Sequence, residues 1–351
     1  MQTIQKLLPL AIAAAGFASV LPSRAERIFG LEANNTLFTF DSATPGTTTT
    51  VGVLSGVLIN QTIVGIDFRP ATKELVAMSF DTANRTGYLY RVNTTTAMLT
   101  VIGSGFALPA DTTGSDWAFD FNPLVDRIRA VNGTSFRNFR LNPDTGGLAG
   151  TDTNVNPGVS LVGAAYSNNV AGATSTTLFV YNATTDHLGT LGGVGGVPSP
   201  NGGLFLGVGA SGVTASSGQL DLDISGVTGV GYGVLRNIAN PGGALYTINT
   251  TTGAFTLVGA ITGRTVVDLS VDPVVPVVFY QVSAKAPSKE GTVKGAGSFA
   301  AGSTVTLKAK AKKGFEFVGW FEGGERISTK AKLTISNLTA NRNLKAKFEE
   351  D

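Results

Sequence analysis

The sequence predicts an all-β protein, a five-bladed β-propeller followed by a small β module. Three observations carry this prediction. A strand-and-turn phrase recurs along the chain, a second strand phrase alternates with it, and no stretch after residue 25 shows helical periodicity with caps. Units of four strands repeating every roughly 40–67 residues are typical of propeller blades.

The first phrase is an aromatic-rich strand that ends in Asp or Asn and leads into a Thr-rich turn. Asn and Asp bond to their own downstream backbone, and Gly supplies positive φ, so the phrase predicts a β-hairpin. The copy LYRVNTTTAMLTVIG at 89–103 returns as LYTINTTTGAFTLVG at 245–259, which we place three repeat units later. The five copies begin at Leu37, Leu89, Asn138, Leu178 and Leu245.

The second phrase predicts the first strand of each unit. Its residues are apolar at successive positions, as expected for a strand whose sheet is packed on both faces. The copies are VGIDFRP at 64–70, WAFDFNP at 117–123, VGAAYSN at 162–168, LDLDISG at 220–226 and VVDLSVDP at 266–273.

The order of the phrases predicts how the ring closes. Residues 27–54 carry three strands without a first one, and residues 266–273 carry a first strand without successors. Joined, they complete one blade, and closure removes the edge strands of an open sheet. The count is then five blades; six is the alternative, because the second and third blades are degenerate.

Residues 1–25 are predicted to be a signal peptide. Lys6 precedes an apolar run at 7–20 that is too short for a stable membrane span, and small residues at 23 and 25 suit cleavage. The chain has no Cys, which excludes a lipoprotein anchor and disulfides. We expect a secreted, extracellular or cell-surface protein, with the periplasm as the alternative, and no transmembrane segment after signal cleavage.

Charge divides the remaining chain into two predicted domains. Residues 26–276 hold 11 Lys and Arg against 17 Asp and Glu, whereas residues 277–351 hold 13 against 7. This break predicts a propeller domain at 26–276 and a basic β domain at 277–351. In the basic domain STVTLKAKAK alternates cleanly, and the core must come largely from four aromatic residues, Phe315, Phe317, Trp320 and Phe321.

Both domains resemble known families. Through VGIDFRP…LVAMS and LYTINTTTGAFTLVG, residues from about 27 to 273 resemble a secreted bacterial family known as domain of unknown function 4394. That family has no established activity, so the resemblance implies only the fold and the compartment. Through AAGSTVTLKA…GFEFVGW…LKAKF, residues from about 277 to 349 resemble the divergent InlB B-repeat, a module of bacterial surface and secreted proteins.

Four aspartates align at one position of the first-strand phrase, while the fifth copy has Ala165. Equivalent strands would place these carboxylates around the propeller axis. We favour the interpretation that each one binds backbone N–H groups of the adjacent turn. The alternative is a ring that binds a hard cation such as Ca²⁺; no other cofactor is expected. The candidate metal ligands are Asp67, Asp120, Asp223 and Asp268.

Four arginines cluster in the hairpin DRIRAVNGTSFRNFR at 126–140. Guanidinium groups can bind uronate, sulfate or phosphate in bidentate fashion. The alternative is that they pair with Asp126, Asp144 and other acids of a domain with net negative charge. Both interpretations stay open for Arg127, Arg129, Arg137 and Arg140. This hairpin and the Gly-rich stretch at 189–218 are where the repeat copies differ most.

Three further motifs give weak signals. GVGASG at 207–212 matches a dinucleotide-binding pattern but lies in the Gly-rich stretch without a helix signal. DLDISG at 221–226 resembles the start of a calcium loop, but its twelfth place is Tyr232, which has no carboxylate, so a strand is the better interpretation. The single histidine, His187, excludes catalytic schemes that need two.

These observations predict an exported binding or cell-surface, adhesion-type protein with a propeller scaffold and no evident catalytic activity. The expected partners are a polysaccharide, an envelope polymer or a surface protein, and no nucleic acid. One alternative is a propeller hydrolase or lyase that acts on extracellular glycans through Asp and Arg. Another is a structural matrix component.

Overall fold

The computed structural model describes residues 25–114, 116–214, 220–237, 239–274 and 279–351. The predicted signal peptide lies outside these residues except for its last position. The chain divides into two compact units, the first up to Val274 and the second after it. The boundary expected near residue 276 falls at 275–278, outside the described residues. In the described ranges, no helix is long and apolar enough to cross a membrane.

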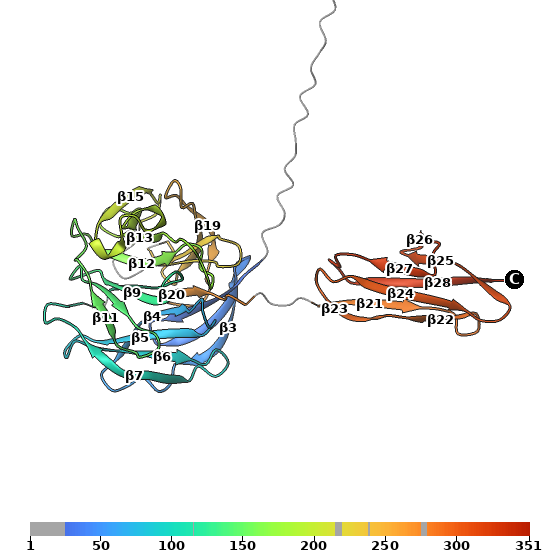
Figure 1. Ribbon diagram of the computed structural model, residues 1–351, viewed down its shortest axis with the longest axis horizontal. Coiled ribbons are helices and arrows are strands. Elements are labelled where there is room, and N and C mark those ends of the chain that lie inside the picture. Colours follow the sequence, from blue (N-terminus) through green and yellow to red (C-terminus); the bar gives the residue numbers. More distant parts are fainter. Residues whose placement is uncertain (1–24, 115, 215–219, 238, 275–278) are drawn as a thin grey trace, which may run out of the picture. The chain divides into compact units, whose positions relative to one another are not determined.

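The described part of the first unit consists of four-stranded antiparallel sheets (Figure 1). Four of them each use consecutive strands. These are β4 (Thr62–Phe68), β5 (Leu75–Asp81), β6 (Thr86–Val92) and β7 (Leu99–Ala107); then β8 (Trp117–Asn122), β9 (Arg127–Asn132), β10 (Asn138–Leu141) and β11 (Leu148–Thr151). The next are β12 (Leu161–Tyr166), β13 (Leu178–Asn182), β14 (His187–Leu191) and β15 (Phe205–Ala210); then β16 (Leu220–Ile224), β17 (Gly231–Leu235), β18 (Ala244–Ile248) and β19 (Phe255–Ala260).

A further sheet joins the two ends of the first unit. Its order is β20 (Val266–Val271), β1 (Arg27–Glu32), β2 (Thr36–Asp41) and β3 (Thr44–Val53). β20 pairs antiparallel with β1, with Val271 opposite Ile28 and Asp268 opposite Leu31. The last strand of the unit therefore belongs to the same sheet as the first three strands and pairs with the first of them.

The first strands of the sheets lie next to one another. They contact in the order β4, β8, β12, β16 and β20, and β20 also contacts β4. Apolar side chains fill the space between neighbouring sheets; Phe80 of one sheet meets Trp117 of the next edge-on, at 5.0 Å between ring centroids. Every residue of β12 and β16 is buried, as expected for strands packed on both faces.

The repeated hairpin phrase occupies equivalent places in most sheets. Leu89 on β6 and Leu245 on β18 both lie on the third strand of sheets that are three apart in chain order. The copy that begins at Leu178 also forms a hairpin, of β13 and β14, but β13 is the second strand of its sheet and not the third. Residues 167–177 form no strand, so β13 pairs directly with β12.

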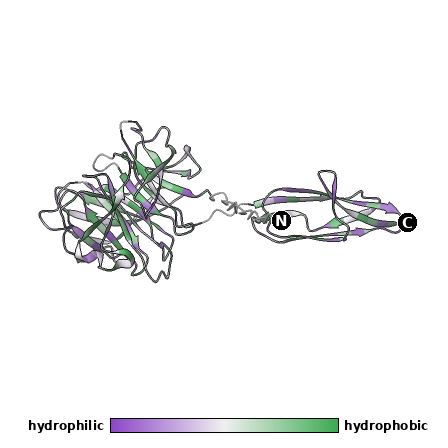
Figure 2. Ribbon diagram, turned by 90° about the horizontal axis from the view of Figure 1, so that it is seen from above, coloured by the Kyte–Doolittle hydropathy of each residue, from purple (hydrophilic) through white to green (hydrophobic). Residues whose placement is uncertain are grey.

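The second unit has a five-stranded and a three-stranded sheet. Their orders are β23 (Gly297–Ala300), β21 (Phe279–Lys285), β28 (Arg342–Glu350), β25 (Phe315–Glu322) and β26 (Glu325–Ser328), and β22 (Gly291–Lys294), β24 (Val305–Ala311) and β27 (Lys332–Ile335). The strands alternate between hydrophobic and hydrophilic residues (Figure 2). Trp320 is fully buried in the core with Phe317 beside it, but Phe321 lies outside it, under the Lys347 ammonium.

Candidate functional site

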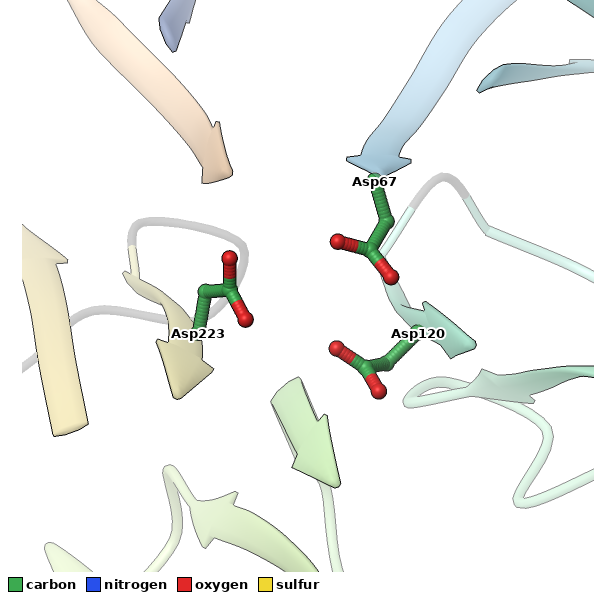
Figure 3. Close-up of side chains that lie close together, drawn as sticks. All are labelled: Asp67, Asp120 and Asp223. Carbon is green, nitrogen blue, oxygen red and sulfur yellow. The ribbon is translucent and has the colours of Figure 1, made fainter. Parts of the chain in front are cut away.

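Three aspartates meet where the first strands surround a common centre. Asp67 on β4, Asp120 on β8 and Asp223 on β16 point their carboxyl groups toward one another (Figure 3). One oxygen from each lies within 4.8 Å of the other two, and all three residues are at most 2% exposed. We call these three residues the axial cluster.

Each carboxylate of the axial cluster also bonds to the next sheet. It accepts a hydrogen bond from a backbone N–H on the first strand of that sheet, and not from an adjacent turn. The bonds run from Phe121 N to Asp67 Oδ2 (2.8 Å), from Tyr166 N to Asp120 Oδ1 (2.9 Å) and from Val271 N to Asp223 Oδ2 (2.6 Å). The side chains thereby tie successive sheets together.

The structure does not place Asp268 with the other three predicted ligands. Ser270 holds the equivalent position: its Oγ accepts from Phe68 N at 3.0 Å and donates to Asp67 Oδ1 at 2.8 Å. Alternate residues of a strand share a face, so Asp268 lies on the same face as Ser270 but two residues earlier on β20. There it lies beside Asp221. The correct alignment uses the proline that follows the strand. It matches SVDP with DFRP and DFNP, so that Ser270 aligns with Asp67 and Asp120.

The centre of the first unit is rich in buried carboxyl groups. Burial, together with neighbouring carboxylates, raises the pKa of Asp67, Asp120 and Asp268 well above the usual range. Burial raises the pKa of Asp221 to about 8 and of Asp223 to about 6. In the described ranges no Lys or Arg forms an ion pair with any of them, and Asp223 Oδ1 and Asp268 Oδ1 lack hydrogen-bond partners.

We expect the first unit to lose stability as the pH rises from 5 to 8 in metal-free buffer. A carboxyl group whose pKa is raised on folding binds more protons in the folded state, so the free energy of unfolding falls with pH. The loss begins above the unfolded pKa near 3.9 and continues through about 6 for Asp223 and about 8 for Asp221. Each such group contributes a slope of up to about 1.4 kcal/mol per pH unit.

Urea unfolding at pH 5.0, 6.5 and 8.0 measures this effect. The chain has one histidine, so few other side chains titrate in this window. Stability that increases with pH over the same range would contradict the expectation.

The second candidate region is a pocket of about 370 Å³ beside the hairpin of β9 and β10. Arg127, Arg129 and Arg140 all contribute to its lining. Arg129 is 3% exposed and donates to Asp152 Oδ2 (2.6 Å) and to Asn201 Oδ1 (2.6 Å). Arg140 binds both oxygens of Asp152 at 2.8 Å. We call this cavity the arginine pocket.

Arg127 differs from the other arginines of the pocket. Its Nη1 donates to the carbonyl oxygen of Asp126 at 2.7 Å, and within the described ranges no carboxylate forms an ion pair with it. The expected acidic partners, Asp126 and Asp144, both pair with Arg69 instead. Arg127 is half-buried and lines the pocket, and its only charge interaction with these two acids is a longer-range one with Asp144.

The fourth arginine of the cluster lies elsewhere. Arg137 pairs with Asp111 and does not line the pocket. The structure thus brings three of the four predicted arginines together, one of them without an acidic partner.

Exposed apolar residues surround the arginine pocket. Leu124 and Val125, on the turn before β9, line it and are 47% and 53% exposed. Val194 and Val197, which are each 80% exposed, flank in sequence the lining glycines at 195 and 196. The Arg hairpin and the Gly-rich stretch were separate signals in the sequence, and the structure joins them at one pocket.

Comparison with known proteins identifies both units. Residues 36–270 match the family described as domain of unknown function DUF4394. The chain belongs to the DUF4394 family. Residues 280–351 match the divergent InlB B-repeat domain. Both resemblances are confirmed, and no curated protein matches the chain significantly.

Solved structures similar to this DUF4394 protein are distant. A protein of unknown function from Bacteroides caccae is 10% identical, with a TM-score of 0.44, over 70% of this chain and 85% of that one. An exo-β-1,3-galactanase from Phanerochaete chrysosporium is 11% identical, with a TM-score of 0.40, over 93% and 89%. Regucalcin, a calcium-binding protein from Agrobacterium tumefaciens, is 13% identical, with a TM-score of 0.37, over 71% and 78%.

The weak motifs of the DUF4394 unit are structural. GVGASG at 207–212 covers the end of β15 and the bend after it, and up to residue 214, where the described segment ends, there is no helix N-terminus to hold a pyrophosphate. DLDISG at 221–226 begins on β16, as the strand interpretation predicted. His187 opens β14, with Nδ1 at 2.6 Å from the carbonyl oxygen of Thr185.

Proposed function

We propose that this DUF4394 protein is an exported, cell-surface binding protein that holds an acidic polymer in its arginine pocket. The observation that carries the proposal is Arg127, which lines the pocket and forms no ion pair with any carboxylate of the described residues. Guanidinium groups form strong bidentate hydrogen bonds with carboxylate, sulfate and phosphate. A buried or half-buried cation without an acidic partner suits a ligand that supplies the negative charge.

The scaffold of this proposal is a closed five-bladed β-propeller. Its support is the contact order of the first strands, β4, β8, β12, β16, β20 and back to β4, together with the pairing of β20 with β1. The bonds from each axial side chain to the next sheet add to it. Propellers use loops at the ends of such sheets to bind ligands.

An acidic polysaccharide fits the pocket best among anionic polymers. The lining includes three arginines, and the one acid that pairs with two of them, Asp152, has a side chain that is only 6% exposed. The exposed rim of Leu124, Val125, Val194 and Val197 offers an apolar surface to the carbon face of a sugar ring. A uronate or a sulfated sugar combines both features in one residue.

The second unit is proposed to assist attachment. It is the InlB B-repeat domain, and its lysines alternate with apolar residues along strands such as β24, so that they face solvent. Such a surface attracts anionic envelope polymers, and the attraction weakens with salt. Export would depend on the signal peptide predicted at residues 1–25.

The geometry favours binding over two alternatives. One is cleavage of glycans by a hydrolase or lyase, and the other is a structural role in a matrix. The lining of the arginine pocket has no carboxylate that could act as acid or base. The four aspartates predicted as ligands all accept backbone N–H bonds, and none of them lines the arginine pocket. A matrix component would show high-order self-association in sedimentation experiments.

Arg127→Gln is expected to weaken binding of an acidic polysaccharide by about 10-fold or more, because a hydrogen bond to a charged group contributes about 1.5–3 kcal/mol. Affinity electrophoresis in gels containing polygalacturonate, chondroitin sulfate or neutral dextran measures this. The control is Arg91→Gln, which makes the same charge change at an arginine that is 46% exposed and pairs with Glu74.

We expect an acidic polymer to retard the wild type and Arg91→Gln, but not Arg127→Gln. Equal loss in both variants would indicate general charge attraction, and equal retardation of the wild type by dextran would indicate that charge has no role. Either result contradicts the proposal.

A further inference from the structure

We propose that the axial cluster of the DUF4394 unit binds one hard divalent cation, Ca²⁺. The site consists of Asp67, Asp120 and Asp223, with the Ser270 hydroxyl beside them. It is independent of the arginine pocket, so either proposal can fail while the other holds.

The geometry suits calcium. Ca²⁺ takes oxygen ligands at about 2.3–2.6 Å, so two oxygens on opposite sides of the ion lie about 4.6–5.2 Å apart. The three carboxylate oxygens of the cluster lie within 4.8 Å of one another and therefore fit around one ion. All nearby donors are carboxylate or hydroxyl oxygens, whereas zinc sites use mainly nitrogen and sulfur.

An unpaired oxygen points to a missing partner. Asp223 is 1% exposed, and its Oδ1 accepts no hydrogen bond from any residue that the structure describes, while its Oδ2 accepts from Val271 N. Figure 3 shows this carboxyl group facing Asp67 and Asp120 across the centre. A buried carboxylate oxygen without a partner is costly, and a bound cation would satisfy it.

The groups around the cluster are acidic as well. Asp221 and Asp268 lie one level along the strands, and Glu26 adds negative charge on the side of Asp223. In the part of the chain that the structure describes, no basic side chain pairs with the cluster. The backbone bonds from Phe121, Tyr166 and Val271 hold the carboxylates in place before any ion arrives, which reduces the cost of binding.

Isothermal titration of the purified protein with CaCl₂ at pH 7.5, after chelator treatment and dialysis, tests the proposal. We expect one Ca²⁺ per chain. The same ion should raise the Tm of the DUF4394 unit by about 5–10 °C when present at 100 times its dissociation constant. Neither readout requires a variant, so the test does not depend on whether a substituted protein folds.

Asp120→Asn and Asp223→Asn are expected to reduce Ca²⁺ affinity at least 10-fold, because Asn keeps an oxygen that can accept the backbone N–H but loses the charge. The matched control is Asp268→Asn, a carboxyl group of similar burial outside the cluster, which should keep the stoichiometry of one. Circular dichroism verifies that each variant is folded.

Two results would overturn the proposal. One is the absence of Ca²⁺ binding and of any Tm shift, which would mean that the carboxyl groups share protons instead. The other is Ca²⁺ binding that Asp120→Asn and Asp223→Asn leave unchanged, which would place the ion elsewhere.

Discussion

Trp320→Ala is expected to unfold the second unit and leave the DUF4394 unit folded. Trp320 is fully buried, stacks edge-on against Phe317 at 5.9 Å, and donates its indole N–H to the carbonyl oxygen of Ala331. Replacing a buried Trp by Ala costs about 3–5 kcal/mol. A domain of this size has about 4–12 kcal/mol of stability in total, so the loss is at least a quarter of the total and all of it at the lower end of that range.

Differential scanning calorimetry of the whole protein measures this effect. We expect two transitions in the wild type, of which Trp320→Ala removes or strongly lowers one and leaves the other in place. The control is Phe279→Ala, which removes an aromatic side chain that is 61% exposed in the same unit and should shift neither transition by more than about 2 °C. Loss of both transitions in Trp320→Ala would contradict the independence of the units.

Phe29→Ala is expected to destabilise the DUF4394 unit by about 3–5 kcal/mol. Phe29 lies on β1, the strand that bonds to β20, and is 1% exposed. It meets Phe68 of the next sheet edge-on at 5.4 Å. The substitution therefore leaves a cavity at the place where the end of the unit joins its beginning, and we expect the unit to lose stability as a whole.

Urea unfolding followed by near-ultraviolet circular dichroism measures the loss. Val53→Ala, at a side chain that is 62% exposed on β3 of the same sheet, is the control and should change stability by less than about 0.5 kcal/mol. A loss below about 1 kcal/mol in Phe29→Ala would mean that the contacts between these sheets contribute little to the fold.

Local chemistry made most of the fold predictable. Asp or Asn at the end of a strand, followed by Thr and Gly, specifies a hairpin from a few residues; Asn93 and Asn249 accept from the N–H groups two and three residues on. The copy at Leu178 has the same local pattern, yet its strand number depends on whether residues 167–177 pair with β12. The residues of the turn do not determine which strands pair.

The axial cluster was partly predictable for a related reason. A repeat alignment identified Asp67, Asp120 and Asp223 as equivalent, because each precedes an apolar residue at the end of a first strand. Asp268 was misplaced because residues two apart on a strand, here Asp268 and Ser270, face the same side, and the sequence alone does not say which of the two faces the other three aspartates.

Pairing of the arginines was not predictable in detail. Their partners come from distant loops: Asp111 for Arg137, and Asp152 for Arg129 and Arg140. The acids nearest in sequence, Asp126 and Asp144, are taken by Arg69, which lies after β4 of the preceding sheet. Only the packing of neighbouring sheets decides that Arg127 is the one left without a carboxylate.

A crystal structure of the protein grown with trigalacturonate, an acidic trisaccharide, tests the proposed function most directly. The account predicts a galacturonate carboxylate within hydrogen-bond distance of the Arg127 guanidinium, with the sugar ring against the rim of Leu124, Val125, Val194 and Val197. A trisaccharide bound only to the lysines of the second unit, with the arginine pocket filled by water, would contradict it.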